Sequence, residues 1–464
     1  MNDHYPLLVI GGGPAGLAAA ATAAAQGVNC ALLDEQPAPG GQIYRAIESA
    51  PEQRARKLGL EYLHGRELVA GFRGSNADYF PGTQVWSVDN ELRVGVLRND
   101  RARFISSDRI IIASGAMERP VPFPGWTLPG VMQAGAGQIL FKSAGVVPDE
   151  GLVLVGSGPL LLLLAWQYLH AGVEIQALLD VTPFSNHLKA LPRLPRALLA
   201  HRYLSKGIGY QIELKRAGIP MRFGVGDLSA EGDERLQRVR FSHAGKRKSI
   251  TCQLLLTHFG VIPHIWLTQA AGCKHRWDSS QQCWRPELDD WGNTDIDGIL
   301  VAGDGAGING ARAAEHAGHL AGLEAAAALG RINRSERDRL AKNDRKWMQR
   351  ENHIRPFLEA YFRIPENLLA TPDNDTIVCR CEEVTAGQIR EAVATGHENS
   401  NQVKFFTRCG MGPCQGRQCS NAVAHIVAEA RGRTAAEMGL FRGRPPVAPL
   451  TLGQLAALRR ESDA

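Results

Sequence analysis

A strand, a glycine-rich turn and a helix follow one another near the start of the chain, and this order restricts the fold more than any other feature. The apolar run LLVI at 7–10 predicts the strand, and the alanine-rich stretch after residue 16 predicts the helix. In a G-x-G-x-x-G turn, the glycines allow a tight turn, the approach of a pyrophosphate and close packing of helix on strand. The turn residues are Gly11, Gly13, Pro14, Ala15 and Gly16. The pattern predicts a parallel α/β fold that binds a dinucleotide.

Two acidic residues end the next predicted strand, NCALLDE. Asp34 lies 23 residues after Gly11, and Glu35 follows it. A carboxylate at this place can hold the ribose hydroxyls of the dinucleotide. The N-terminus of the helix would supply N–H groups and a dipole to the phosphates. The alternative is a glycine-rich turn kept only for packing, and the combination of strand and acid weighs against it.

Three later segments bear on the choice between FAD and NAD. A Gly-Gly-Gln loop follows the acidic strand at 40–42, RIIIASGAMERP (109–120) puts a small-residue turn after an apolar strand, and ILVAGDGAG (299–307) places an aspartate after another. These segments resemble the two-dinucleotide-fold flavoproteins. The resemblance implies an FAD site that includes Gly41, Gln42, Ser114, Gly115, Gly303, Asp304 and Ala311. An N-cap role for Asp304 is the simpler alternative, and the two roles are compatible.

Residues 152–180 repeat the order of strand, glycine turn, helix, strand and acid. Gly156 and Gly158 are present, but Leu161 replaces the third glycine, and Asp180 ends the second strand. Leucine at that position should push the helix away from the strand. No arginine cluster follows Asp180 to receive a 2′-phosphate. We therefore expect a nucleotide fold that holds an adenine nucleotide such as ATP or NAD, or that serves only as a scaffold.

Five of the nine cysteines lie between residues 379 and 419, and the other four are isolated. Isolated thiols are typical of a reducing compartment, and the chain has no C-x-x-C dithiol. Cys379 and Cys381 form a C-x-C pair, and Cys409, Cys414 and Cys419 are candidates for two further ligands. Thiolates suit either an iron–sulfur cluster or structural zinc. The flavin motif on the same chain favours the cluster.

The cysteine segment resembles the small [2Fe–2S] domain of the bacterioferritin-associated-ferredoxin type. That family has C-x-C, a spacer of about thirty residues and then a close cysteine pair. The 32 residues between Cys381 and Cys414 fit the spacer better than the 27 before Cys409, although the second pair here is C-x4-C instead of C-x2-C. The resemblance implies Cys379, Cys381, Cys414 and Cys419 as ligands, with Cys409 as the alternative. We expect one helix capped by Thr385 and another after Cys419.

Length and charge limit the classes of protein that remain. A chain of 464 residues is too long for one simple core and predicts several domains. The net charge of +5 is modest and its basic residues are scattered, which argues against a nucleic-acid partner. The N-terminus lacks the basic region of a signal peptide, and the apolar run at 160–169 is too closely flanked by glycine and polar residues to span a bilayer. We expect a cytoplasmic protein that is not transmembrane.

Over nearly its full length the chain resembles the α (B-type) subunit of bacterial heteromeric amine dehydrogenases, which include opine oxidase, D-hydroxyproline dehydrogenase and hydrogen cyanide synthase. The resembling segments are GGGPAGLAAA, DEQPAPGGQIYR, IIASGAMERPVPFPGWTLPGVMQAGA, VGSGPLLLLLA, CWRPELDDWG, VAGDGAGINGARAAE and CRCEE…TRCGMGPCQGRQC. The resemblance implies two Rossmann-like domains and a small α-helical [2Fe–2S] domain. The expected parts are an FAD domain (1–120 and 285–330), a second nucleotide domain (121–284), a helical linker (331–371), the cluster domain (372–431) and a docking tail (432–464).

The same resemblance implies an electron-transfer subunit of an oxidoreductase that acts on CH–NH donors. The substrate would be a secondary amine or amino acid of the opine, D-hydroxyproline or glycine type, oxidised to an imine. Its pocket would lie on a β subunit with an amine-oxidase-like fold and its own FAD. A small γ ferredoxin-like subunit, an FMN at a subunit interface, a respiratory acceptor and peripheral attachment to the inner face of the cell membrane complete the expectation.

Two other functions fit parts of the sequence. A self-contained NAD(P)H-dependent reductase that feeds the cluster needs a working second nucleotide site, and Leu161 counts against it. A non-catalytic scaffold would not need Asp34, Gly41 and Asp304 together. Near the predicted flavin helix, Glu315 and His316 are expected to be packing or surface residues instead of an acid/base pair.

Overall fold

The protein divides into two compact units in the computed structural model, which describes residues 1–149, 151–371 and 373–458. The first unit comprises residues 1–117, 262–352 and those from Gly443 onward, and the second comprises 118–261 and 353–442. Residues 262–284 thus lie in the first unit, whereas we expected them in the second nucleotide domain. The expected linker is also shared, because the first unit includes its residues up to 352.

The first unit contains a sheet whose strands follow the order β3-β2-β1-β6-β5-β4, with β19 also paired to β6. Strand β1 lies between β2 and β6 and is parallel to both, with Leu7 opposite Cys30 and Arg109. All five residues of β2 are buried, as expected for a parallel strand covered on both faces. The strands are β1 (His4–Ile10), β2 (Cys30–Asp34), β3 (Asp78–Pro81), β4 (Gln84–Val88), β5 (Arg93–Arg98), β6 (Arg101–Ile112), β17 (His275–Asp278), β18 (Cys283–Pro286) and β19 (Ile299–Val301).

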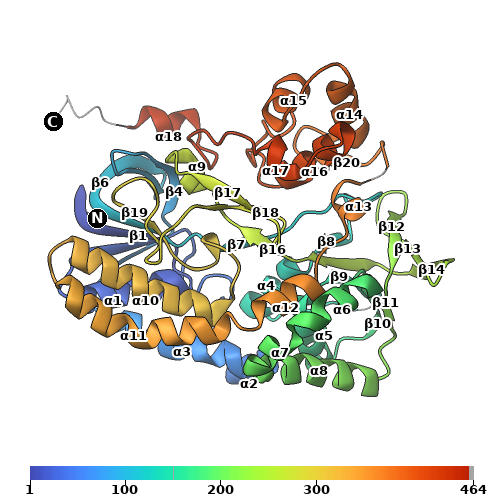
Figure 1. The fold of residues 1–464 in the computed structure, drawn as a ribbon, viewed down its shortest axis with the longest axis horizontal. Helices are drawn as coiled ribbons and strands as arrows, with labels where there is room; N and C mark the ends of the chain where they lie inside the picture. Colours follow the sequence, from blue (N-terminus) through green and yellow to red (C-terminus); the bar gives the residue numbers. More distant parts are fainter. Residues whose placement is uncertain (150, 372, 459–464) are drawn as a thin grey trace. The chain divides into compact units, whose positions relative to one another are not determined.

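Two helices far apart in the sequence pack closely in this unit. Figure 1 shows α10 alongside α1, and α11 alongside α10. A Cβ added to Gly318 would lie 2.1 Å from the carbonyl oxygen of Ala15, and one added to Gly322 would lie 2.6 Å from that of Ala19. Small residues thus let the two backbones meet. The helices are α1 (Pro14–Ala25), α2 (Glu52–Leu58), α3 (Leu60–Arg73), α9 (Trp266–Ala270), α10 (Ala311–Ala328), α11 (Arg334–Glu351) and α18 (Leu452–Ala456).

Part of the expected docking tail packs on the first unit. Val447 and Ala448 are buried, and the Val447 N–H donates to the carbonyl of Trp86 (2.8 Å). The short helix α18 follows, and Leu452 on it is exposed. Residues 459–464 of the tail lie outside the described residues. The segment around Val447 therefore contributes to the core of this chain.

The second unit contains a five-stranded sheet in the order β11-β10-β9-β15-β8 and a three-stranded sheet, β12-β13-β14. All the pairings of the five-stranded sheet are parallel. Its strands are β8 (Val131–Gln133), β9 (Leu152–Ser157), β10 (Ile175–Asp180), β11 (Met221–Phe223) and β15 (Leu254–Phe259), and the others are β12 (Gly226–Glu231), β13 (Arg238–His243) and β14 (Lys246–Thr251). Strands β7 (Ala116–Glu118) and β16 (Val261–Pro263) lie where the chain passes between the units.

Helices make up most of the rest of the second unit. They are α4 (Ala134–Ala144), α5 (Pro159–Ala171), α6 (Phe184–Ala190), η1 (Leu191–Arg193), α7 (Leu194–Ala197), η2 (Leu198–Ala200), α8 (His201–Arg216), α12 (Arg355–Tyr361) and α13 (Glu366–Leu369). Helix α5 contains the apolar run at 160–169. Among the described residues, no helix has both the length and the apolar character needed to cross a bilayer.

The cysteine segment forms a helical module within the second unit. It consists of β20 (Ile377–Cys379), β21 (Val384–Thr385), α14 (Ala386–Ala394), α15 (Ser400–Thr407), α16 (Ser420–Arg431) and α17 (Ala435–Met438). Both helices predicted from the sequence are present. Thr385 caps α14 in a capping box with Gln388, and α16 begins directly after Cys419.

We predict that Gly318→Val destabilises the first unit by about 3 kcal/mol, because the added side chain would collide with the Ala15 carbonyl of α1. Urea unfolding followed by circular dichroism measures the loss. Gly71→Ala is the matched control, since a Cβ there meets no atom within 4 Å, and it should change stability by less than about 1 kcal/mol. Equal stability of the two variants would contradict the close packing of α1 on α10.

Candidate functional site

The predicted glycine turn joins β1 to α1. Gly11 has a φ of 108°, and a Cβ on it would lie 2.4 Å from the carbonyl oxygen of Ala113. A Cβ on Gly16 would lie 1.8 Å from the carbonyl oxygen of Gly11. Only glycine fits at these two places, so α1 begins in direct contact with the end of β1. This is the arrangement that brings a helix N-terminus to a pyrophosphate.

The loop at 40–42 lies against this turn. The Gly40 N–H donates to the Gly12 carbonyl (2.8 Å), and a Cβ on Gly41 would lie 2.7 Å from the Cα of Gly13. By contrast, a Cβ on Gly13 would meet only the Cα of Gly41, at 3.9 Å. Gly13 therefore faces open space, which is what close approach of a phosphate requires.

Asp34 and Glu35 differ in their surroundings. Asp34 is buried at the end of β2, and its Oδ1 accepts from the Gln36 N–H (3.1 Å). Burial raises the pKa of this carboxyl, and hydrogen bonds from the Gln36 and Gly12 N–H groups oppose the rise. Glu35 is exposed. Asp34 is thus the acid that lies beside the glycine turn.

Asp304 holds the turn that leads into α10. Its Oδ1 accepts from the N–H groups of Asn309 (2.9 Å) and Gly310 (3.0 Å). Asp304 thus braces the turn before α10, but it is not the N-cap residue suggested by the sequence, because Gly310 occupies that position. The adjacent Gly303 is packed on Ala15 of α1, because a Cβ there would lie 2.7 Å from the Ala15 Cβ.

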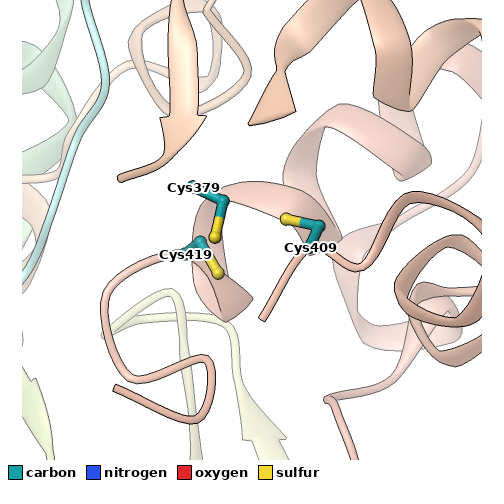
Figure 2. A group of neighbouring side chains, drawn as sticks. All are labelled: Cys379, Cys409 and Cys419. Atoms are coloured by element: carbon teal, nitrogen blue, oxygen red, sulfur yellow. The ribbon is translucent and has the colours of Figure 1, made fainter. Parts of the chain in front are cut away.

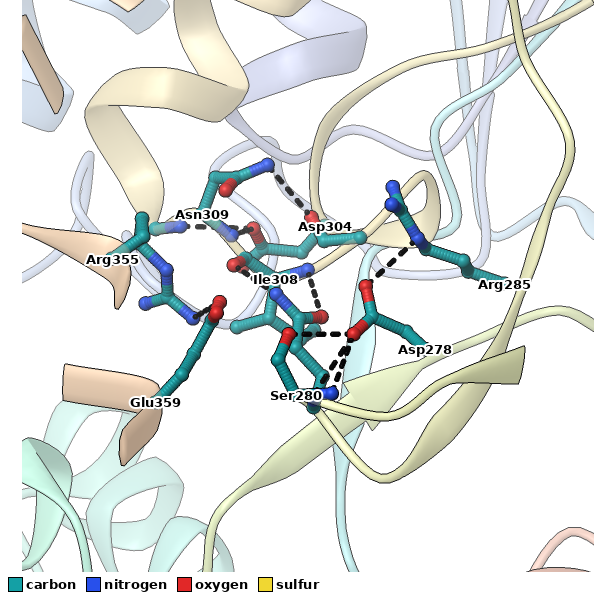
Figure 3. A network of polar contacts seen from close by, with 11 residues as sticks. Asp278, Ser280, Arg285, Asp304, Ile308, Asn309, Arg355 and Glu359 are labelled. Carbon is teal, nitrogen blue, oxygen red and sulfur yellow. Dashed lines mark hydrogen bonds and ion pairs between the residues drawn. The ribbon is translucent and has the colours of Figure 1, made fainter. Parts of the chain in front are cut away.

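A hairpin turn between β17 and β18 supports the same loop, and no sequence motif pointed to it. The Gln281 side chain accepts from the Ile308 N–H (3.0 Å) and donates to the Ile308 carbonyl (3.0 Å). Asp278 holds the turn by accepting from Ser280 Oγ (2.6 Å) and pairing with Arg285 (3.1 Å) (Figure 3). Burial would raise the pKa of Asp278, but hydrogen bonds from Ser280 and Gln281 outweigh it and lower the pKa.

Ser114 and Gly115 follow the end of β6 and are fixed by one residue. Ser114 Oγ donates to the His264 carbonyl (2.7 Å), and the His264 N–H donates to the Gly115 carbonyl (2.9 Å). A Cβ on Gly115 or Gly310 would meet no atom within 4 Å. The glycines at 13, 115 and 310 thus have open space at their Cβ positions, and Gly13 and Gly310 directly precede α1 and α10. These residues fit an FAD.

Glu315 and His316 are engaged in packing contacts on α10. Glu315 bonds to His64 (2.8 Å), and His316 Nδ1 bonds to Asp344 of α11 (2.7 Å). His319 Nδ1 reaches the same Asp344 oxygen (2.8 Å). Burial would raise the pKa of Asp344, but the two imidazoles lower it to about 2. These contacts agree with the packing role expected for Glu315 and His316.

The second glycine turn differs from the first in how its helix packs. Gly156 has a φ of 145°, and a Cβ there would lie 1.7 Å from the His258 carbonyl oxygen. A Cβ on Gly158 would lie 3.3 Å from the His258 ring. Leu161 is buried at the place where the first turn accepts only glycine. The second turn therefore accommodates a whole leucine side chain where the first leaves no room for a Cβ.

Residues 361–363 of the same chain lie at the carboxyl ends of β9 and β10, which is where an open α/β sheet binds its nucleotide. Asn186 Nδ2 donates to the carbonyls of Tyr361 (3.1 Å) and Arg363 (2.8 Å), and the Tyr361 ring packs edge-on to His187 at 4.6 Å. Ser157 Oγ lies 3.5 Å from the Phe362 carbonyl. Sequence reasoning missed this covering segment, because its residues come after a long interval.

Asp180 is turned toward its own backbone. It is buried, and its Oδ1 accepts from the Thr182 N–H (2.7 Å). Burial raises the pKa of Asp180, and the hydrogen bonds from Thr182 oppose the rise. Thr182 Oγ1 is bonded in turn to Ser157 Oγ (2.8 Å). The acid predicted to hold a ribose therefore already has a partner within the chain.

Three cysteine sulfurs come together in the helical module. Cys379 ends β20, Cys409 follows α15, and Cys419 precedes α16. All three are buried, their sulfurs lie within 4.8 Å of one another, and Figure 2 shows them pointing toward a common centre. The thiols of Cys409 and Cys419, with the N–H groups of Gly410 and Glu382, lower the pKa of Cys379 to about 2 against the effect of burial.

Cys381 and Cys414 form a second, more exposed group. Cys381 is exposed and Cys414 is half-buried. Burial raises the pKa of Cys381, and its sulfur also interacts with the N–H and thiol of Cys414. Cys409, which the spacing made only the alternative ligand, lies in the buried group. Cys414, which the spacing favoured, lies beside Cys381. The spacer folds into α14 and α15, so the number of residues alone does not say which cysteine it brings beside Cys379.

The glycines of the cysteine loop serve packing as well as chain direction. Gly410 and Gly416 have φ of 86° and 83°, and a Cβ on either would lie within 2.6 Å of the buried Phe441 ring. A Cβ on Gly412 would lie 2.3 Å from the Cβ of Cys381. The loop is thus held tightly between an aromatic ring and the cysteines. Five soft thiol donors with N–H groups directed at Cys379 fit an iron–sulfur cluster, and they would also fit zinc.

Known proteins share both parts of this architecture. The family model described as pyridine nucleotide-disulphide oxidoreductase matches residues 5–319, and the sarcosine oxidase A3 domain matches residues 374–459. An opine oxidase subunit of Agrobacterium tumefaciens (strain Ach5) is 43% identical over 99% of this chain and 92% of its own length. The chain belongs to this family of opine oxidase subunits. It is therefore an oxidoreductase with a flavoprotein fold, and the sequence resemblance is confirmed.

More distant relatives in this family and beyond it extend the comparison. Hydrogen cyanide synthase subunit HcnB of Pseudomonas aeruginosa is 32% identical over 98% of this chain and 99% of its own length. Among solved structures, L-proline dehydrogenase from P. horikoshii has a TM-score of 0.69 at 21% identity, over 97% of this chain and 79% of that one. The latter similarity shows the fold, which extends through the cysteine module.

We predict that Gly13→Val lowers the flavin content of the purified protein at least about tenfold, because the side chain would occupy the space left for a pyrophosphate. The ratio of flavin to protein absorbance measures the loss, and circular dichroism checks the fold. Gly71→Ala serves as control and should retain full flavin. Unchanged flavin in the Gly13 variant would contradict the assignment of this turn.

Proposed function

We propose that the chain is the FAD- and [2Fe–2S]-containing electron-transfer subunit of a heteromeric dehydrogenase. The enzyme would oxidise a secondary amine or amino acid, of the opine, D-hydroxyproline or glycine type, to an imine and pass electrons to a respiratory acceptor. The observation that carries the proposal is that one chain of this opine oxidase family has both the glycine cradle for a flavin and a buried group of thiols.

The residues assigned to FAD would each bind a different part of the cofactor. Gly11, Gly13 and Gly16 would admit the pyrophosphate to the α1 N-terminus, and Gly41 would lie over it. Asp34 would hold the ribose, and the Asp304 loop would support the ribityl chain. Bound FAD supplies two-electron chemistry. The N-terminus of α10 would stabilise negative charge on a reduced flavin.

The cysteine ligands remain as the family spacing implies: Cys379, Cys381, Cys414 and Cys419, with Cys409 as the alternative. The burial of Cys409 beside Cys379 and Cys419 supports its role as a cluster ligand. A [2Fe–2S] cluster in this loop would supply one-electron chemistry. The exposed Cys381 would leave one side of such a cluster near solvent, where single electrons can leave.

A partner subunit would complete the enzyme. The relatives are named subunits, and we assign the substrate pocket to a β subunit with an amine-oxidase-like fold. A small γ ferredoxin-like subunit would be a further component, as would an FMN at an interface. We place the complex in the cytoplasm at the inner face of the cell membrane. The second nucleotide fold would act as a scaffold, because the segment around Tyr361 lies at its usual binding edge. An adenine nucleotide such as ATP or NAD is the alternative occupant.

We expect that NADH and NADPH do not bleach the flavin of the purified chain under anaerobic conditions, whereas dithionite reduces both flavin and cluster. The covering segment and Leu161 make the second site unsuited to deliver a hydride. Absorbance near the flavin maximum follows the titration. The amine should bleach the flavin only when the partner subunit is present. Rapid bleaching by NADH would instead support the NAD(P)H-dependent reductase.

We further predict that Cys379→Ser removes the cluster absorbance and leaves the flavin content unchanged. Cys381→Ser and Cys414→Ser should do the same. Comparison with Cys409→Ser decides whether Cys409 is a ligand or whether the set implied by the family spacing holds. Cys252→Ser is the control, because this cysteine is buried in the core of the second unit and does not belong to the group of three thiols. Retention of iron and absorbance in the Cys379 variant, or zinc in place of iron in the parent, would refute the [2Fe–2S] assignment.

A further inference from the structure

Exposed apolar side chains gather in one stretch of the second unit. Eight of the eighteen large apolar residues that are exposed in the described chain lie between residues 184 and 212. The most exposed of them are Phe184, Leu188, Leu191, Leu198, Leu199 and Ile208. Isolated exposed apolar residues are ordinary, but a gathering of this kind marks a surface that binds something.

This stretch is an almost continuous helical run whose apolar residues face solvent. Helices α6, α7 and α8, shown in green in Figure 1, follow one another through η1 and η2 without an intervening loop. Between 184 and 200, only Asn186, Ala190 and Ala197 are buried. The large apolar residues of this stretch recur every three to four residues, at positions other than these three buried ones. A surface helix normally turns such a stripe toward the core, so this run has the reverse orientation.

The charges of the same run have one sign. Lys189, Arg193, Arg196, Arg202 and Lys206 lie within it, and no aspartate or glutamate occurs from Val181 to Ile212. The first four are exposed. Cations interleaved with apolar side chains on a helical surface are typical of segments that lie on a membrane. Anionic lipid headgroups attract such cations, while the apolar residues enter the headgroup region.

We propose that residues 184–212 form a docking surface for an anionic lipid membrane. A second copy of the chain would bring its five cations against these five, which charge repulsion opposes. Anionic headgroups would supply the opposite charge that this run lacks. The proposal rests on the location given above, the inner face of the cell membrane, and names the surface that would bind there. Its test uses neither substrate nor partner subunit, so its failure would leave the proposed function intact.

The test is flotation of the purified, FAD-loaded chain with vesicles of phosphatidylcholine alone and with vesicles that also contain phosphatidylglycerol. We expect binding to the anionic vesicles only, with loss at high salt. Arg193→Gln with Arg196→Gln should weaken binding by about tenfold or more. Leu198→Ser with Leu199→Ser should weaken it by about 100-fold through lost apolar burial.

Matched variants outside the run serve as controls. Lys246→Gln with Arg247→Gln removes two exposed cations from β14 in the same unit, and Leu452→Ser removes an exposed leucine from α18. Both should bind vesicles like the parent. Absence of binding by the parent, or equal loss in controls and variants, would overturn the proposal. So would a dimer in size-exclusion chromatography that the Leu198/Leu199 variant dissociates, because the run would then join two copies.

Discussion

The close approach of α1 and α10 is the interaction on which the first unit depends. Gly318 and Gly322 leave no side chain between the two helices, and Gly303 is packed on Ala15 in the same region. A long stretch of sequence separates the glycine turn from the Asp304 loop, and this contact brings them to one place. The candidate FAD site therefore depends on helix packing, and the hairpin turn at Gln281 holds the loop through Ile308.

The two dinucleotide folds of this chain show how small differences change a shared architecture. Both have a glycine turn after a buried strand and an acid at the end of the next strand. In the first fold, Gly16 brings the helix onto the strand, and Gly13 faces open space. In the second, Leu161 is buried at the equivalent position, Asp180 is bonded to Thr182, and the chain around Tyr361 lies over the binding edge. The second unit therefore keeps the dinucleotide fold, while residues 361–363 lie where the ligand of such a fold usually binds.

The cysteine module depends on a different principle, because its loop is shaped by what surrounds it. Phe441 lies against Gly410 and Gly416 and so determines where the chain turns between Cys409 and Cys419. Buried thiols at Cys379, Cys409 and Cys419 then share one centre, and Cys381 with Cys414 lies toward solvent. Burial on one side and exposure on the other suit a group that exchanges single electrons with a partner.

The sequence alone determined the features that depend on neighbouring residues. The turn at Gly11–Gly16, the cap at Thr385, the helix after Cys419 and the family itself could all be predicted, since local spacing and backbone conformation specify them. Only the tertiary structure decided which cysteines share a centre, that Tyr361 to Arg363 lies at the second nucleotide site, that Val447 belongs to the core, and that the 184–212 run turns its apolar side chains outward. These outcomes depend on contacts between distant segments, whose positions follow from the packing of whole helices and sheets and not from the spacing of residues along the chain.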